Sequence, residues 1–313
     1  MLNKILTINV KPVGNACNIH CCYCDSERNS SVQLLHIPTY VSYLKNLSSQ
    51  YDFIHIILHG GEPLLASVDY LEEIFETTCS ELGTKCDFQL QTNGTLLTDE
   101  NLQLLQKKNC KLSISFDPSD KNLRYDKKTY EHVKNNIIHA IAMGNRPGVI
   151  SVVHQKNHPY IVPFIEELLA MKIPYWTINK IRADKLSPYF ITENKYLTVL
   201  LDVLQEWVEK KAYETLSIQP LMDLLSPGEN HSCHFNMLND KCSHFSSISS
   251  TTIIPYCEHY CGKNNRLKKC ENCKLYYICG GGCPSDNPDE EFCISRQFFL
   301  KKIELFKKQT GMI

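Results

Sequence analysis

The sequence contains no long apolar run and no long block of like charge. No stretch of about 18 consecutive apolar residues occurs, so no membrane-spanning helix is expected. Met1 to Val10 also lacks the apolar core and small-residue cleavage site of an export signal. Acidic and basic residues are balanced, at 34 and 33, and give no indication of a nucleic-acid or anionic-membrane partner. We therefore expect a cytoplasmic globular protein that binds neither nucleic acid nor membrane.

Cysteine, in contrast, is abundant. In a reducing compartment 16 cysteines are better explained by metal binding than by disulfides. Nine of them lie between Cys233 and Cys293, which divides the chain into a cysteine-moderate and a cysteine-dense part. The turn sequence Ser226-Pro227-Gly228 is suited to mark the boundary, near residue 225.

Short apolar runs alternate with amphipathic stretches in the first part. The amphipathic stretches include Val68 to Leu82, Tyr130 to Met143 and, further on, Thr192 to Lys210. Six runs have the length and composition of strands: Ile5 to Val10, Phe53 to Leu58, Phe88 to Gln91, Leu112 to Phe116, Val149 to Val153 and Trp176 to Ile181. Strands separated by helices predict an α/β protein with a parallel sheet and an active site at the carboxyl ends of its strands.

A ligand pattern follows the first expected strand. Cys17, Cys21 and Cys24 have three residues and then two between them. Three thiolates on one loop can hold three irons of a 4Fe-4S cluster and leave the fourth iron open to a small molecule. Part of a zinc site, or a set of buried thiols, is the alternative interpretation.

This loop resembles that of the radical S-adenosylmethionine (SAM) superfamily, which reads Cys-x3-Cys-x-aromatic-Cys, with Tyr23 in the aromatic position. The resemblance implies a partial (β/α)6 TIM-like barrel. It also implies a 4Fe-4S cluster whose open iron binds S-adenosyl-L-methionine, and a 5'-deoxyadenosyl radical that abstracts hydrogen from a substrate.

Further cofactor-binding candidates follow the next strands. Gly60, Gly61, Glu62 and Pro63 resemble the Gly-Gly-Glu-Pro motif that binds the methionine amino group in this superfamily; two glycines allow close backbone approach and the glutamate offers an acceptor. Asn93 within Thr92-Asn93-Gly94 resembles another superfamily feature, and Ser115 resembles a serine that contacts the cofactor ribose. For all of these, ordinary turn and capping chemistry is the simpler alternative.

The cysteine-dense part resembles the SPASM extension of peptide-modifying radical enzymes, including the anaerobic sulfatase-maturating enzymes. The resemblance implies two auxiliary 4Fe-4S clusters, three clusters in all. Carried over by position, one auxiliary cluster takes Cys233, Cys242, Cys257 and Cys283, and the other takes Cys270, Cys273, Cys279 and Cys293. Thr252 stands where the family usually has glycine, and the interval between Cys257 and Cys270 is short. Cys261 is therefore an alternative to Cys233. A pair of zinc knuckles is an alternative to both clusters, because Cys-x2-Cys suits zinc as well as iron.

Glu258 directly follows Cys257, where the sulfatase-maturating enzymes have an aspartate thought to act as a base. A carboxylate near a buried cluster is expected to have a raised pKa and to take a proton from the substrate; a solvated surface glutamate is the alternative. The remaining thiols, of Cys22, Cys79, Cys86 and Cys110, are interpreted as packing residues.

Together these features predict a radical SAM/SPASM maturase, an oxidoreductase-type enzyme that modifies the precursor of a ribosomally made peptide. Oxidation of a small alcohol is the alternative within enzymes, and an iron-sulfur electron carrier is the alternative from another class. The expected organisation is a barrel over residues 1–190, a helical linker over 191–225, the SPASM domain over 226–293 and a helix over 294–313. In that last helix Ile294, Phe298, Ile303 and Phe306 are expected to face inward.

The expected partners are a peptide and an electron donor of flavodoxin or ferredoxin type. The first expected strand begins near Ile5, and about twenty residues follow Cys293. Within this sequence we therefore expect no fused leader-binding domain. Recognition of the peptide would then come from a separate leader-binding protein or from a strand edge of the enzyme itself.

Overall fold

The computed structural model describes residues 4–24, 31–118, 123–225, 235, 244–258, 267–283, 286 and 288–310. The chain divides into two compact units. Unit 1 consists of Met1–Phe116, Lys121–Gly148 and Cys242–Glu258, and unit 2 of Asp117–Asp120, Val149–Lys241 and His259–Ile313. The domain limits expected at residues 190, 225 and 293 stay a prediction.

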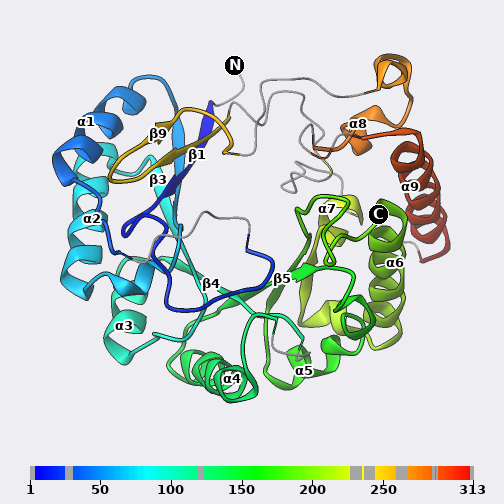
Figure 1. The fold of residues 1–313 in the computed structure, drawn as a ribbon, viewed down its shortest axis with the longest axis horizontal. Helices are drawn as coiled ribbons and strands as arrows, with labels where there is room; N and C mark the ends of the chain where they lie inside the picture. The colour runs from blue at the N-terminus through cyan, green and yellow to red at the C-terminus, as the bar shows by residue number, and fades with distance from the viewer. Residues whose placement is uncertain are drawn as a thin grey trace. The chain divides into compact units, whose positions relative to one another are not determined.

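Strands and helices alternate along the chain (Figure 1). The strands are β1 (Ile5–Val10), β2 (Phe53–Leu58), β3 (Cys86–Thr92), β4 (Lys111–Ser115), β5 (Gly148–Val153), β6 (Tyr175–Lys180), β7 (Ser217–Gln219), β8 (Phe245–Ile248) and β9 (Ile253–Ile254). The α-helices are α1 (Ile37–Ser48), α2 (Val68–Leu82), α3 (Asp99–Lys107), α4 (Lys127–Ala142), α5 (Phe164–Ala170), α6 (Glu193–Glu209), α7 (Leu221–Leu225), α8 (Tyr276–Cys279) and α9 (Glu290–Thr310). All six predicted strands and their alternation with helices are confirmed.

Unit 1 is built on a sheet with the strand order β4-β3-β2-β1-β8-β9. Strands β1 to β4 and β8 run parallel, and β9 pairs antiparallel with β8. Buried and half-buried residues alternate along β1 and β2, as expected where one face of a strand meets the core. Because the strands are parallel, their carboxyl ends lie along one edge of this sheet.

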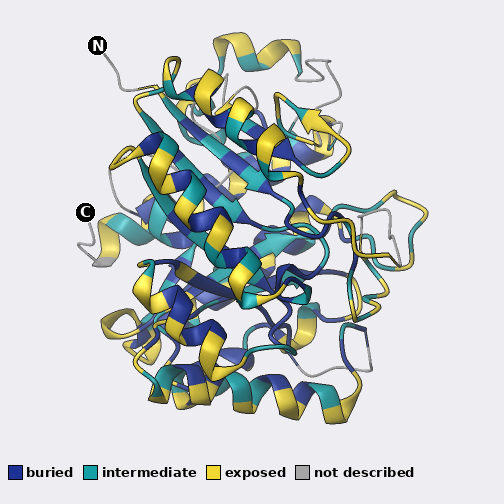
Figure 2. Ribbon diagram, turned by 90° about the vertical axis from the view of Figure 1, so that its left-hand side faces the viewer, coloured by how far each residue is buried: buried dark blue, intermediate teal, exposed yellow. Residues whose placement is uncertain are grey.

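Hydroxyl and carboxylate caps fix the starts of the unit 1 helices. The side chains of Ser67, Thr98 and Asp126 accept hydrogen bonds from the first turns of α2, α3 and α4. Figure 2 shows that buried residues follow one side of the helices and exposed residues the other. No helix in the described ranges combines the length and apolarity needed to cross a membrane.

Unit 2 contains the strand order β7-β6-β5, with β6 and β7 parallel. Trp176 of β6 is buried, and its indole N–H donates to the hydroxyl of Ser151 on β5 at 2.9 Å. Helix α6 begins after Thr192, whose hydroxyl accepts from the backbone of Lys195. Strand β7 was not predicted, because three residues are too few to show a strand pattern.

The predicted inward face of α9 is partly wrong. Ile303 is buried, but Ile294 and Phe298 are 63% and 55% exposed. The buried face instead contains Phe292, Ser295, Arg296, Phe299, Leu300 and Ile303. The apolar pattern did not indicate this face, because the buried face includes the charged Arg296, which is 1% exposed and paired with Glu193.

Candidate functional site

Four segments of unit 1 meet at the carboxyl edge of its parallel strands. The cysteine loop follows β1, and the turn that contains Gly60 and Gly61 follows β2. Asn93 directly follows β3, and Ser115 is the last residue of β4. The structure therefore brings the cofactor-binding segments predicted for this unit to one edge of one sheet.

The cysteine loop is anchored by its backbone. The N–H of Cys22 donates to the carbonyl of Leu123 at 2.8 Å, and that of Cys24 donates to the carbonyl of Cys21 at 3.3 Å. Cys17 and Cys21 are half-buried and Cys24 is exposed, and none of the three is in a disulfide. The thiols are thus chemically available as ligands on a loop whose backbone is tied to Leu123.

Two glycines after β2 lie directly against this loop. Gly60 has a φ of +114°, and a Cβ added to Gly61 would lie 1.8 Å from the carbonyl oxygen of Ala16. The N–H of Gly61 donates to the carbonyl of Gly14 at 3.0 Å. Only glycine allows this approach, so the turn and the cysteine loop form one backbone assembly.

The buried Glu62 side chain links the turn after β2 to the end of β3. Its carboxylate accepts hydrogen bonds from the N–H of Leu64 at 3.0 Å, the hydroxyl of Thr92 at 2.7 Å and the N–H of Asn93 at 2.7 Å. Burial raises the pKa of the Glu62 carboxyl, and these three donors oppose the increase. The carboxylate thus holds the turn to the end of β3, and its role toward an ammonium group stays a prediction.

Asn93 contacts the cysteine loop through its side chain. Its amide nitrogen donates to Asn18 Oδ1 at 2.8 Å and lies 3.8 Å from Cys17 Sγ, while its oxygen accepts from the N–H of Thr95 at 2.9 Å. These partners define the orientation of the amide, which presents its N–H₂ group to the thiol. Asn93 can therefore donate a hydrogen bond to a metal-bound Cys17 thiolate.

Two side chains from the segment after β4 complete this edge. Arg124 donates from Nε to the hydroxyl of Tyr23 at 3.0 Å, with its guanidinium 5.4 Å from the centre of the ring. The Tyr125 hydroxyl donates to the carbonyls of Asn93 and Ser115. The structure thus links Tyr23, Asn93 and Ser115, predicted to bind the cofactor, through a tyrosine and an arginine that the sequence did not single out.

Glu258 lies at the same edge, after β9. Its carboxylate forms an ion pair with Lys11 at 2.9 Å, and Lys11 also donates to Asn15. Burial acts to raise the pKa of Glu258, but hydrogen bonding and the charge of Lys11 outweigh it, and the pKa lies below its ordinary value. The expected upward shift is therefore wrong. Lys11 was missed, although a lysine directly after the first strand was the available signal.

The four ligands predicted for one auxiliary cluster are all described within unit 2, and their thiols are half-buried: Cys270, Cys273, Cys279 and Cys293. Burial raises the pKa of Cys270, and the charges of Cys279, Cys293 and Cys273 raise it further. The N–H of Cys273 donates to the carbonyl of Cys270 at 3.2 Å. These four side chains therefore share one local environment.

The other auxiliary ligand set is only partly described. Cys257 in unit 1 and Cys283 in unit 2 are half-buried. Cys233, Cys242 and the alternative Cys261 lie outside the described residues. Within the described ranges, no three or more His, Cys, Asp or Glu side chains converge on a point that could hold one metal ion. A 4Fe-4S cluster makes a different demand, because each thiolate binds a separate iron.

The remaining thiols differ in burial. Cys110 is buried and Cys86 half-buried, as packing residues would be. Cys22 and Cys79 are exposed, so the packing interpretation is wrong for these two.

Comparison with known proteins identifies this architecture. The family model described as the Radical SAM superfamily matches residues 12–167, which include the cysteine loop, the glycine turn, Asn93 and Ser115. The chain belongs to the radical SAM superfamily, whose members use a 4Fe-4S cluster and S-adenosylmethionine.

Two relatives illustrate the range of similarity. An uncharacterized protein of Methanocaldococcus jannaschii is 30% identical over 202 residues, which cover 61% of this chain and 65% of that protein. The cysteine-type anaerobic sulfatase-maturating enzyme of Clostridium novyi is 22% identical over 363 aligned positions, covering 96% of this chain and 95% of the enzyme.

Solved structures show the same fold. The enzyme anSMEcpe with bound AdoMet and the Cp18Cys peptide has a TM-score of 0.81 at 18% identity, over 97% of this chain and 99% of that one. Streptococcus suis SuiB bound to the precursor peptide SuiA has a TM-score of 0.63 at 15% identity, over 91% and 73% of the two chains.

Proposed function

We propose that this chain is a radical SAM maturase that abstracts hydrogen from a peptide, the precursor of a ribosomally synthesised and post-translationally modified peptide. The product would carry a crosslink or another oxidative modification. The observation that carries the proposal is the backbone assembly of the cysteine loop with the Gly60-Gly61 turn, because it joins a three-thiolate ligand set to a cofactor-binding motif.

The donor set of this edge fits a site-differentiated 4Fe-4S cluster. Cys17, Cys21 and Cys24 supply three soft thiolates, and Asn93 supplies an N–H donor to one of them. Cys17, Cys21 and Cys24 would hold the cluster with one iron open to the methionine end of S-adenosylmethionine, and the cluster would supply the electron for reductive cleavage of that cofactor.

The chain's own residues have distinct roles in this proposal. Gly60 and Gly61 let the backbone reach the methionine amino group, and the buried Glu62 carboxylate keeps that turn in place. Tyr23 and Ser115 line the nucleoside side of the cofactor, with Arg124 and Tyr125 holding them. The support is the pair of hydrogen bonds by which the neighbouring residues Arg124 and Tyr125 contact the Tyr23 hydroxyl and the Ser115 carbonyl, respectively.

We assign the proton-accepting role to Glu258. The ionised carboxylate can accept a proton from an oxidised substrate, although its lowered pKa makes it a weaker base than the sequence predicted. Lys11 holds the carboxylate at 2.9 Å and limits the directions in which it can turn.

The C-terminal cysteines are proposed to form a SPASM domain with two auxiliary 4Fe-4S clusters, for a total of three clusters. One cluster takes Cys270, Cys273, Cys279 and Cys293, and the other takes Cys233 or Cys261 with Cys242, Cys257 and Cys283. The shared environment of the four unit 2 thiols supports the first of these sets.

A peptide substrate is favoured by the fold, which this chain shares with enzymes solved in complex with peptides. Recognition of that peptide is proposed to come from a separate leader-binding protein or from a strand edge of the enzyme itself, and reduction from a donor of flavodoxin or ferredoxin type. A plain electron carrier would not need a glycine turn packed against its cysteine loop.

Metal analysis and product analysis test the proposal together. Anaerobically reconstituted protein should contain about twelve irons, because three four-iron sites are expected, and no stoichiometric zinc. With dithionite and a peptide deuterated at each candidate position, label should appear in 5'-deoxyadenosine. A content of about four irons and two zincs per chain would contradict the auxiliary clusters. Cleavage of the cofactor without transfer of deuterium from the peptide to 5'-deoxyadenosine would contradict the substrate class.

A further inference from the structure

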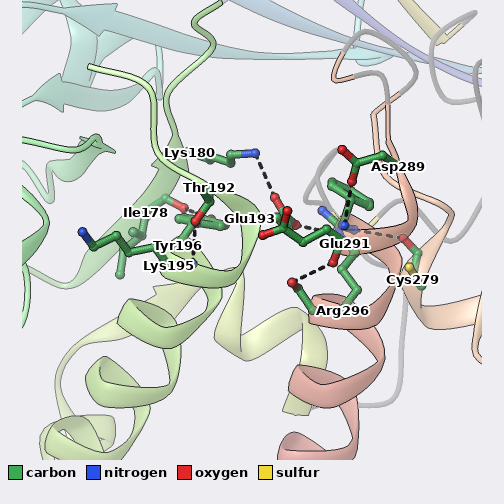
Figure 3. Close-up of polar contacts among 12 residues, drawn as sticks. Ile178, Lys180, Thr192, Glu193, Lys195, Tyr196, Cys279, Asp289, Glu291 and Arg296 are labelled. Atoms are coloured by element: carbon green, nitrogen blue, oxygen red, sulfur yellow. Dashed lines mark hydrogen bonds and ion pairs between the residues drawn. The ribbon is translucent and has the colours of Figure 1, made fainter. Parts of the chain in front are cut away.

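A network of buried charges joins β6, α6 and α9 within unit 2 (Figure 3). Glu193, the first residue of α6, accepts from Lys180 Nζ at 2.9 Å and from Arg296 Nε at 2.7 Å. Their side chains are 9%, 5% and 1% exposed for Lys180, Glu193 and Arg296. The network thus contains two cationic groups and one carboxylate in the interior of the unit.

Arg296 connects this network to the cysteines. Its guanidinium lies between two aromatic rings, 4.6 Å from the centre of Phe235 and 4.5 Å from that of Phe292. Its Nη1 atom donates to the carbonyl of Cys279 at 3.2 Å. Gly282, with a φ of +81°, packs on the same phenylalanine, because a Cβ there would lie 2.3 Å from the Phe292 ring. The segment from Cys279 to Gly282 therefore contacts Arg296 at two points, directly through the Cys279 carbonyl and indirectly through the Phe292 ring.

The two groups at the centre of this network, Glu193 and Arg296, are held in their charged forms. Burial raises the pKa of Glu193, but the charges of Arg296 and Lys180 outweigh it, and the net pKa is lowered. The Arg296 guanidinium stays charged because arginine does not deprotonate in proteins, and its Nε donates to the Glu193 carboxylate at 2.7 Å. The guanidinium therefore keeps a full positive charge beside Cys279.

Stability alone gives a weak reason for such a network, because desolvation of buried ions commonly cancels their attraction. A fixed charge beside a metal ligand has a second consequence. It favours the reduced form of a metal centre, since reduction adds negative charge, and the effect is large where the dielectric constant is low.

We infer that Arg296 is a positioning residue that fixes Cys279 and raises the reduction potential of the centre held by Cys270, Cys273, Cys279 and Cys293, with Glu193 opposing it. The inference rests on the auxiliary cluster that the proposed function assigns to Cys270, Cys273, Cys279 and Cys293. It assigns to this chain an electrostatic control of that cluster which is separate from the thiolate ligands.

The test uses a full-length parent in which Cys17, Cys21 and Cys24 are alanine, so that only clusters of the C-terminal cysteines contribute. Dithionite is the reductant, and the reduced clusters are followed by electron paramagnetic resonance during a redox titration. Adding Cys270→Ala to the parent identifies which signal belongs to the centre beside Arg296.

Charge changes of opposite sign should move that signal in opposite directions. Glu193→Gln should raise its potential and Arg296→Gln should lower it, each changing the ratio of reduced to oxidised centre at least about tenfold, or about 59 mV for one electron. Arg296→Lys keeps the charge and should lie within about threefold of the parent, or about 28 mV. Glu166→Gln removes an exposed carboxylate paired with Lys210 in the same unit and should change nothing.

Each result has a definite meaning. Shifts of the same sign for Glu193→Gln and Arg296→Gln, or no shift in either, would overturn the inference while leaving the cluster in place. If Arg296→Gln does not retain iron, the other two variants decide the matter. Glu193→Gln must still raise the potential, and Arg296→Lys must still lie within about threefold of the parent. A parent without a reducible C-terminal cluster would overturn the proposed auxiliary clusters and this inference together.

Discussion

The backbone N–H of Glu62 donates a 2.8 Å hydrogen bond to the carbonyl of Ala16, the residue directly before Cys17. With the bond from Gly61 to Gly14, it pairs the Gly-Gly-Glu turn with the segment leading into the cysteine loop. The cofactor motif is thus held at a fixed position relative to the cluster ligands, although Glu62 lies 38 positions after Cys24 in the sequence. Displacement of either segment should therefore affect both the cluster and the cofactor.

Gly61→Ala tests this coupling. The added methyl group would lie 1.8 Å from the Ala16 carbonyl oxygen, so the turn must separate from the loop. We expect SAM affinity to fall at least about tenfold, equivalent to about 1.4 kcal/mol, measured by anaerobic equilibrium dialysis.

Gly83→Ala is the matched control. Gly83 has a φ of +59°, so alanine is strained there by the backbone conformation, but nothing lies within 4 Å of the added Cβ. The control should lose some stability and keep its SAM affinity. Equal loss of affinity in both variants would show that strain alone, and not the contact with Ala16, explains the effect.

Simultaneous replacement of Cys17, Cys21 and Cys24 by alanine should abolish reductive cleavage of S-adenosylmethionine. Only this loop is expected to leave an iron open to the cofactor, so about eight irons should remain in the auxiliary sites. Chromatographic measurement of 5'-deoxyadenosine under dithionite decides the outcome. Formation of that product in the triple variant would contradict the assignment of the loop.

Glu258→Gln should separate cofactor cleavage from product formation. The amide has nearly the same shape but cannot accept a proton, so 5'-deoxyadenosine should still form while the yield of modified peptide falls at least about 100-fold, within the usual range for general base catalysis. Mass spectrometry of the peptide measures this ratio. Glu81→Gln, which removes a distant carboxylate paired with Lys45 at 3.9 Å, is the control and should leave both products unchanged.

Much of this architecture could be predicted from the sequence, because its signals are local. Each of the six predicted strands is a short apolar run between helical stretches. Its inward residues, such as Ile54 and Ile56 of β2, are fully buried. The cysteine spacing and the Gly-Gly-Glu turn are likewise local patterns, and the structure brings both to one sheet edge.

Interactions between distant residues could not be predicted in this way. Lys11 and Glu258 are 247 residues apart, and Glu193 and Arg296 are 103 apart. A charged residue is ordinarily expected at the surface, and only its partner in the folded chain makes burial tolerable. The incorrect face of α9 follows from the burial of Arg296 with Glu193, and the incorrect pKa direction of Glu258 follows from its pairing with Lys11.

Cysteine labelling tests the burial of the remaining thiols. Burial, together with the charges of Cys79 and Asp87, raises the pKa of Cys86 to about 11. The reactive thiolate fraction is therefore about one in a thousand at pH 8, and labelling by iodoacetamide should accelerate about tenfold for each pH unit between 7 and 9. Exposed Cys79 should react readily at pH 8, and buried Cys110 should stay unlabelled. Peptide mapping measures all three, and rapid labelling of Cys110 would contradict the described core.

Two adjacent phenylalanines of α9 test the corrected helix face. Phe299 is 1% exposed and stacks on Phe235 with ring centres 5.6 Å apart, whereas Phe298 is 55% exposed. Phe299→Ala should lower the free energy of unfolding by about 3–5 kcal/mol, because it removes buried apolar surface and leaves a cavity. Phe298→Ala should change it by less than about 0.5 kcal/mol, as is usual for exposed positions. Anaerobic denaturant titration compares the two variants under one condition. A larger loss for Phe298→Ala would restore the face predicted from the sequence, and Arg296 would then have to lie toward solvent.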